Sequence, residues 1–292
     1  MHLFKDLTRL ATGFGGMALS MVAAGQVLAQ EVPFRGEPVD GGIGFQEAAT
    51  SLAAKSFWID NILLWLISGI TIFVTGLMIW VIVFHNKRVH PTPARFTHNS
   101  PLEVAWTILP VFILIAIGAV TVPALFRSQI MPEAAVTIKA TGYQWYWGYE
   151  YVDHGVEFSS YMLQRDELEE FGYEPRHYLL ATDSQMVVPV GQDVVLQVTG
   201  ADVIHSWAMP AFGVKQDGVP GRLAHLWFNV DEPGIYFGQC SELCGQGHSF
   251  MPIVVRAVPE ADYIAWLQEQ GAENLAAAPG YDATVQLAAA SE

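Results

Sequence analysis

Charged side chains are scarce in this sequence, and positively charged ones are the scarcest. Asp, Glu, Lys and Arg together make up 15% of the 292 residues, while hydrophobic residues make up 52%. This composition is too apolar for an ordinary soluble protein, yet too polar for a bundle made only of membrane helices. No internal repeat is present. The sequence therefore predicts a mixed architecture, with a membrane part and a water-exposed part.

The few Lys and Arg residues are unevenly placed. The whole chain has 14 of them against 29 Asp and Glu, and residues 131–292 hold 6 against 22. An acidic domain of this kind repels nucleic acid and anionic membrane surfaces, and it attracts a basic protein over a few Debye lengths. From charge alone, a solvated acidic surface that keeps the domain soluble is the favoured interpretation.

The N-terminus is typical of a secretory signal. Lys5 and Arg9 precede a short, weakly apolar run, and Val27-Leu28-Ala29 has the small residues of a cleavage site. A first membrane helix is the alternative, but the run is shorter than the ~18–20 apolar residues that cross a bilayer. We expect a signal peptide over residues 1–29 and an exported, irregular segment over 30–56.

Two later segments are long enough to span a membrane. Residues 62–84 and 104–126 contain no charged side chain, and each would form ~35 Å of helix against a hydrocarbon core of ~30 Å. We expect a hairpin over 57–130, with helices at about 57–85 and 102–127. The connection, residues 86–101, carries Lys87, Arg88 and Arg95, so the positive-inside bias places it in the cytoplasm and the rest outside.

After Pro132 the pattern changes to short alternating strands separated by turn residues. We expect strands at Val136–Ala140, Met186–Val190, Val194–Val198, Leu226–Val230, Ile235–Phe237 and Ile253–Val258. The acidic segment 165–174 is expected to form an inserted helix, and residues 260–270 a short helix before a flexible tail, within 259–292. The predicted fold class is membrane-anchored all-β: a helical hairpin followed by a β-sandwich or barrel over 131–258.

Sulfur and imidazole donors gather near residue 240. Cys240, Cys244, His248 and Met251 form a C-x3-C-x3-H-x2-M array, and His205 ends another apolar run upstream. Such soft donors favour copper over magnesium or calcium, and Met is an unusual ligand for zinc. A mononuclear blue-copper site needs only one Cys, whereas two thiolates can bridge two metal ions. The alternative is a disulfide, which is the usual interpretation of two Cys in an exported domain.

These motifs resemble subunit II of the haem-copper cytochrome c oxidases. The similarity covers residues 57–258 and includes Gly238-Gln-Cys-Ser-Glu-Leu-Cys-Gly245, Val203-Ile-His-Ser-Trp207 and Gln144-Trp-Tyr-Trp147. It implies a cupredoxin fold with a binuclear copper A centre. In that resemblance Cys240 and Cys244 bridge both coppers, His205 and His248 each bind one, and Met251 and the carbonyl of Glu242 are weak ligands.

The resemblance also implies roles for residues outside the ligand set. Trp145, with Tyr146 beside it, would accept the electron, although an aromatic strand is more often core. Cytochrome c would dock on Glu150, Asp183 and Asp202, while Ser159 stands where the family often has an acid. The Glu242 carboxylate would bind magnesium shared with subunit I, and Glu103 would open a proton-uptake path. Sequence alone favours a solvated acid for Glu242, and for Glu103 a charge at a helix N-terminus explains the residue as well as the proton path does.

The function implied is electron entry into an oxidase of the bacterial inner membrane. The chain would take electrons from cytochrome c and pass them to a haem-bearing subunit I that reduces oxygen to water and pumps protons. Membrane lipid and other oxidase subunits are the further expected partners, and nucleic acid is not one. Two alternatives stay open: a membrane-anchored periplasmic copper delivery protein, and a structural anchor whose Cys pair forms a disulfide.

Overall fold

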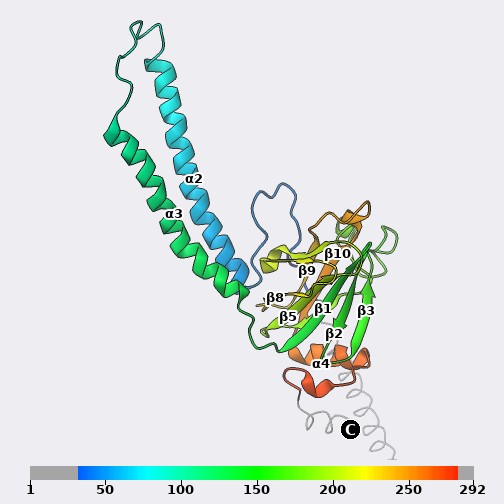
Figure 1. The fold of residues 1–292 in the computed structure, drawn as a ribbon. Coiled ribbons are helices and arrows are strands. Elements are labelled where there is room, and N and C mark those ends of the chain that lie inside the picture. Colours follow the sequence, from blue (N-terminus) through cyan, green and yellow to red (C-terminus); the bar gives the residue numbers. More distant parts are fainter. Residues whose placement is uncertain (1–31, 282–292) are drawn as a thin grey trace, which may run out of the picture. The chain divides into compact units, whose positions relative to one another are not determined.

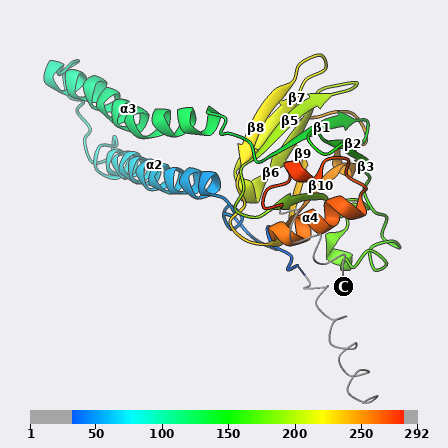
Figure 2. The same ribbon diagram turned by 90° about the horizontal axis from the view of Figure 1, so that it is seen from below.

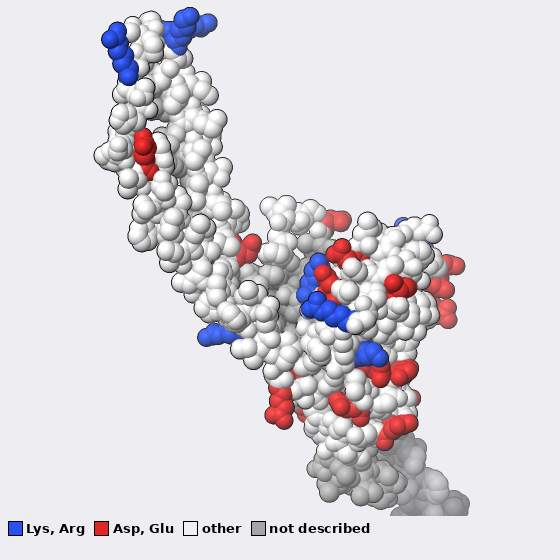
Figure 3. Space-filling model, viewed as in Figure 1, with Lys and Arg blue, Asp and Glu red and all other residues white. Residues whose placement is uncertain are grey.

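Two long helices form the hairpin. The computed structural model describes residues 32–281, so the expected signal peptide and the last part of the tail lie outside the described residues. Helix α2 spans Ser51–Phe84 and α3 spans Ser100–Gln129. Their apolar side chains are exposed, for example 79% for Trp65 and 66% for Leu114, a surface suited to lipid rather than water. Figure 3 shows a hairpin with few charged side chains and with Lys and Arg at its loop end.

Helix α2 begins six residues earlier than the expected start at 57. The Thr50 hydroxyl accepts a hydrogen bond from the Ala53 N–H at 3.0 Å, which makes Thr50 the N-cap. The same hydroxyl donates to the Phe212 carbonyl at 2.7 Å. Hydropathy misses the start of this helix because polar residues, such as Ser51, Lys55 and Ser56, precede the apolar run. The first turn of α2 is therefore anchored to the β domain.

Residues 131–258 fold into two five-stranded sheets (Figure 1). The first sheet has the order β3-β2-β1-β5-β8, and the second has the order β4-β10-β9-β6-β7. The first consists of β1 (Val136–Tyr143), β2 (Tyr146–Tyr151), β3 (Val156–Ser160), β5 (Val194–Gly200) and β8 (Ala224–Phe228). The second consists of β4 (Met186–Pro189), β6 (His205–Met209), β7 (Val214–Gly218), β9 (Gly234–Cys240) and β10 (Pro252–Val258). The expected β-sandwich is confirmed.

The core lies between the two sheets. Along β1 buried and half-buried residues alternate, so Ile138 and Ala140 face inward while Lys139 faces outward. Trp147 and Trp207, each 0% exposed, fill the centre, and β1 pairs with β5 in parallel. Four strands were not expected: β2, β3, β6 and β7. Strand β6 is buried at every position, so it lacks the alternation by which strands are recognised.

The expected helix over residues 165–174 is wrong. This segment forms a succession of turns, followed by the short 3-10 helix η1 (Pro175–His177). Its buried anchors Leu163, Leu168 and Tyr173 are spaced by five residues, which no single helix face can accommodate. Gly172, at φ +79°, then reverses the chain. The acidic residues that suggested a helix lie on the outside of these turns.

The remaining elements are one short α-helix, three 3-10 helices and the segment before α2. Helix α4 (Glu260–Glu269, orange in Figure 2) occupies the segment where a short helix was expected. It packs on β4, and its Tyr263 and Leu267 are buried. Three further 3-10 helices are η2 (Pro210–Phe212), η3 (His248–Phe250) and η4 (Leu275–Ala277). The segment before α2 is irregular but packed, because Phe34 forms a bridge with Ile235.

Candidate metal centre

Two neighbouring strands bring the donors together. Cys240 is the last residue of β9, and His205 is the first residue of β6, whose Trp207 pairs with Cys240. The chain then forms a loop that carries Cys244 and re-enters the sheet just after Met251, at β10. Antiparallel pairing of β9 with both neighbours thus converts donors far apart in the sequence into one cluster.

Five donor groups converge in this loop. The two cysteine sulfurs lie 3.9 Å apart, and Cys244 Sγ lies 3.5 Å from Met251 Sδ and 3.6 Å from His248 Nδ1. The Glu242 carbonyl oxygen lies 3.3 Å from Cys240 Sγ. Both cysteines are free thiols and are buried, with 5% and 3% exposure. The disulfide-bearing anchor is therefore not what this geometry supports.

The orientation of His205 shows that a metal fits the site. Its ring is fully buried, and its Nε2–H donates to Asp202 Oδ1 at 2.8 Å. The other ring nitrogen, Nδ1, is buried without a hydrogen-bond partner among residues 32–281. A ligand atom of His205 and the two cysteine sulfurs all lie within 4.8 Å of one another. A buried imidazole nitrogen left unpaired beside two thiols is a metal-ligand arrangement.

The thiols have different acidities. Burial opposes ionisation of Cys240, but the nearby His205 ring and the backbone of Glu242 outweigh it and lower the pKa of Cys240 to about 7. Burial, and then the charge on Cys240, raise the pKa of Cys244 to about 12. Two thiols this close do not both ionise easily, so a cation is needed to stabilise a second thiolate beside the first.

Two glycines leave space for the side chains around the cluster. A Cβ at Gly142 would lie 2.7 Å from the His205 ring, so only glycine lets β1 pass so close to that ring. A Cβ at Gly247 would overlap the indole of Trp145, which covers the cysteine loop. Both glycines, one in β1 and one in the donor loop, are therefore required by the tight packing around the donors.

Trp145 lies directly against the donor loop. Its Nε1–H donates to the Cys244 carbonyl at 3.2 Å, and the Gln144 side-chain amide donates to the same oxygen at 2.9 Å. The indole is half-buried, whereas Trp147 is fully buried in the core with its ring 6.1 Å from the ring of His205. The two tryptophans of the aromatic run therefore differ in position: Trp145 lies at the protein surface beside the donor loop, and Trp147 lies inside the domain.

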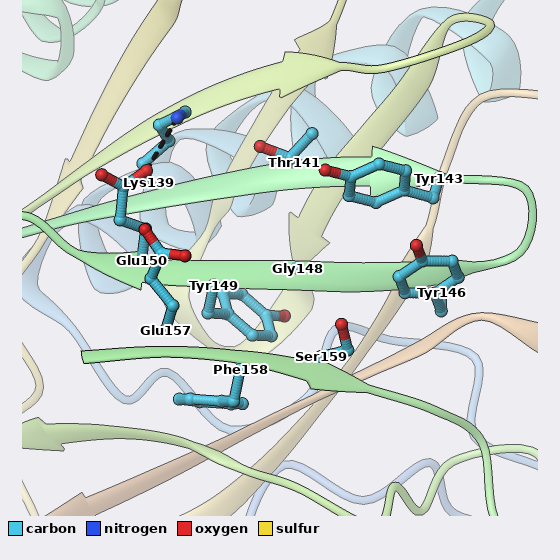
Figure 4. A pocket seen from close by; sticks show the side chains of 10 residues that line it. All are labelled: Lys139, Thr141, Tyr143, Tyr146, Gly148, Tyr149, Glu150, Glu157, Phe158 and Ser159. Atoms are coloured by element: carbon cyan, nitrogen blue, oxygen red, sulfur yellow. Dashed lines mark hydrogen bonds and ion pairs between the residues drawn. The ribbon is translucent and has the colours of Figure 1, made fainter. Parts of the chain in front are cut away.

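Tyr146 belongs to a row of tyrosines on the outer face of the first sheet. Its ring stacks on Tyr143 at 4.7 Å and on Tyr161 at 4.5 Å. Figure 4 shows Tyr143 and Tyr146 at one end of a hollow of about 450 Å³, with Glu150 and Glu157 at the other end and Ser159 on β3. The position where the family often has an acid thus lies inside this hollow.

Each expected docking acid already has a partner within the domain. Glu150 forms an ion pair of 2.7 Å with Lys139, and Asp183 Oδ1 accepts from the Tyr161 N–H at 2.8 Å. Asp202 accepts from His205 and from two backbone N–H groups. Burial opposes ionisation of Asp202, but these hydrogen bonds lower its pKa, so its carboxylate carries a charge. Sequence reasoning did not anticipate the contacts of Lys139 and Asp202.

Glu242 and Glu103 lie in different parts of the chain. The Glu242 carboxylate is half-buried and forms no ion pair with a residue in 32–281. Glu103 lies in the first turn of α3, where its carboxylate accepts from the Asn99 N–H at 3.1 Å and the Asn99 side chain accepts from the Leu102 N–H. This reciprocal capping supports a helix-start role for Glu103.

Comparisons with known proteins match both parts of the chain. The family model of the cytochrome c oxidase subunit II transmembrane domain matches residues 38–124, and that of its periplasmic domain matches residues 136–258. A cytochrome c oxidase subunit 2 of Cereibacter sphaeroides is 53% identical over 284 residues, which covers 92% of this chain and 93% of that protein. A probable cytochrome c oxidase subunit 2 of Rickettsia bellii is 39% identical and covers 88% and 93%.

Among solved structures, the periplasmic domain of subunit II of the cytochrome oxidase of Bradyrhizobium japonicum is 49% identical. The match covers 49% of this chain and 97% of the solved domain, with a TM-score of 0.44. The two family models together match more than half of the chain, and they match it in the order of the hairpin and the β domain. This protein therefore belongs to the cytochrome c oxidase subunit II family, with a membrane hairpin followed by a cupredoxin-like domain.

Proposed function

We propose that this chain is the electron-entry subunit of a proton-translocating cytochrome c oxidase. It accepts electrons from cytochrome c at a binuclear copper A centre and passes them to a haem-bearing subunit I, where oxygen is reduced to water. The observation that carries the proposal is the cluster of two free, buried thiols, a thioether and two imidazoles, one of which, His205, has an unpaired Nδ1.

The second thiol supports a pair of coppers rather than one. Cys240 and Cys244 would bridge both ions, His205 and His248 would each bind one, and Met251 and the Glu242 carbonyl would be weak ligands. When bound, such a pair supplies an electron acceptor whose charge is spread over two metals, so ligand distances change little on reduction. The protein keeps the donors in one geometry by attaching them to β6, β9 and the loop before β10, with His205, Cys240, Cys244 and Met251 buried.

The half-buried Trp145 supports electron entry at this site. Its indole has one part at the surface and is hydrogen-bonded through Nε1 to the residue that provides a bridging thiol. The burial of both cysteines speaks against a copper delivery protein, which must hand its metal to a partner. The acidic face around Glu150 and Asp183 would attract a basic cytochrome c, and Tyr146 lies beside that face.

The remaining assignments concern the membrane. The chain would lie in the bacterial inner membrane with the loop bearing Lys87, Arg88 and Arg95 in the cytoplasm and the copper domain in the periplasm. The half-buried Glu242 carboxylate, which has no ion-pair partner in the described chain, would bind magnesium shared with subunit I. Glu103 would lie at the cytoplasmic edge, where a carboxylate can collect protons for subunit I.

Metal analysis and electron paramagnetic resonance of the purified oxidase test the copper proposal. We expect two coppers per chain at this site and a hyperfine pattern from one electron coupled equally to two copper nuclei. Replacing Cys244 by Ser should abolish that pattern, because a serine hydroxyl stays protonated near neutral pH and cannot replace the soft, anionic thiolate as a bridge. A pattern from a single copper in the parent protein would contradict the proposal.

A further inference from the structure

One carboxylate, that of Asp202, connects the metal cluster with the aromatic turn above it. Asp202 Oδ1 accepts from His205 Nε2–H at 2.8 Å and from the Val203 N–H at 2.7 Å. Its other oxygen, Oδ2, accepts from the Gln144 N–H at 2.8 Å. Both oxygens are therefore used inside the domain, although the side chain is 34% exposed.

The contact with His205 determines which ring nitrogen is free. An imidazole that donates through Nε2–H to a carboxylate leaves Nδ1 as its acceptor atom, and Nδ1 is the nitrogen that has no partner. A carboxylate in this position also fixes the rotation of the ring and raises its strength as a ligand. Asp202 thus determines both the tautomer and the direction of a donor.

The contact with Gln144 completes a closed set of hydrogen bonds. Gln144 is followed by Trp145, and the side chains of both residues donate to the Cys244 carbonyl. The turn between β1 and β2 is thus attached on one side to the His205 ligand, through Asp202, and on the other side to the cysteine loop. A movement of the Asp202 carboxylate would therefore be transmitted to His205 and to the turn that carries Trp145.

We infer that Asp202 is a positioning residue, which orients the His205 imidazole toward the metal and holds Trp145 over the Cys244 loop. The inference rests on the proposed copper function of the site. It assigns Asp202 a different role from Asp183, whose carboxylate accepts a backbone N–H of Tyr161 and contacts none of the donor groups. Steering of a basic partner needs only the charge of Asp202, whereas positioning needs both oxygens at their present distances.

Two variants of Asp202 separate charge from position in the purified, copper-loaded oxidase. Asp202→Glu keeps the charge but moves the oxygens by one methylene, and Asp202→Asn keeps the shape but removes the charge and one acceptor. Asp183→Asn is the matched control, since it loses the same charge on the same domain. The readouts are the copper hyperfine pattern and the rate at which a chelator removes copper, and neither involves cytochrome c.

We expect both Asp202 variants to change the hyperfine pattern and to release copper faster by about 10–100-fold, the usual cost of losing a partner of a metal-bound His. Asp183→Asn should match the parent in both readouts. A parent-like Asp202→Glu, or an Asp183→Asn that shifts as much as Asp202→Asn, would overturn the inference. If Asp202→Asn does not assemble, Asp202→Glu decides alone. Absence of a copper-pair signal in the parent would refute the proposed function instead.

Discussion

Replacing Gly247 by Ala tests how tightly Trp145 covers the donor loop. The backbone of Gly247, at φ −92° and ψ 12°, suits alanine, so the substitution carries no backbone penalty. The new methyl group would overlap the Trp145 indole. Overpacking of this kind costs about 1–3 kcal/mol. If the ring moves away, the hydrogen bond from Nε1 to the Cys244 carbonyl is also lost, which adds about 1 kcal/mol.

We therefore expect Gly247→Ala to destabilise the copper domain by about 2–4 kcal/mol. Calorimetry of the copper-loaded oxidase measures this as a lower unfolding midpoint, by ~2–4 °C for each kcal/mol. The matched control is the same substitution in a Trp145→Ala background, where the methyl group enters space that the indole has left. A double-mutant cycle then isolates the contact. An equal cost of Gly247→Ala in both backgrounds would refute the steric argument.

Three further expectations follow from the same contacts. A protease tag placed within residues 86–98 should be protected when protease is added outside intact cells, while the β domain should be cleaved, and the opposite pattern would reject the proposed orientation. Trp145→Phe should slow electron transfer after docking without altering the salt dependence of association with cytochrome c. Asp183→Asn should lower the rate of that association and flatten its salt dependence. Stopped-flow measurements over a range of salt concentrations distinguish the two effects. The hydrogen bond with Glu150 raises the pKa of Lys139, so the modest stabilisation from this pair is present below the unfolded pKa of lysine and is lost as the pH rises through the higher folded value. Glu150→Gln should therefore lower the pKa of Lys139, which is measured by the rate at which Lys139 is acylated. An unchanged rate would contradict the pairing.

The sequence was informative where local chemistry decides the outcome. The C-x3-C-x3-H-x2-M array predicted a common site, and the structure brings all four side chains together, because a short loop with glycines leaves few other arrangements. The two membrane helices follow from uninterrupted apolar runs. The helix starts at Thr50 and Asn99 depend on capping by single side chains, so hydropathy alone could not locate them.

The sequence was less informative where distant residues decide the outcome. The acids of residues 165–174 favoured a helix, but burial of Leu163, Leu168 and Tyr173 in the core determined the turns. Asp202 lies three residues before His205, a spacing that hints at a contact, yet its bond to Gln144 joins positions 58 residues apart. Only the folded sandwich shows that Asp202, which was expected to dock cytochrome c, is hydrogen-bonded to His205 and to Gln144.

The origin of the donors also has a consequence for biogenesis. His205 comes from β6, Cys240 comes from the end of β9, the other donors come from the loop between β9 and β10, and the covering Trp145 comes from the turn before β2. The donors meet only when β6, β9 and β10 pair within the second sheet, and Trp145 covers them only when the first sheet has also formed, so a partly folded chain has no complete centre. On the proposed function, copper insertion would therefore be a late step, coupled to the folding of the domain. Copper content would then report how much of the protein has matured.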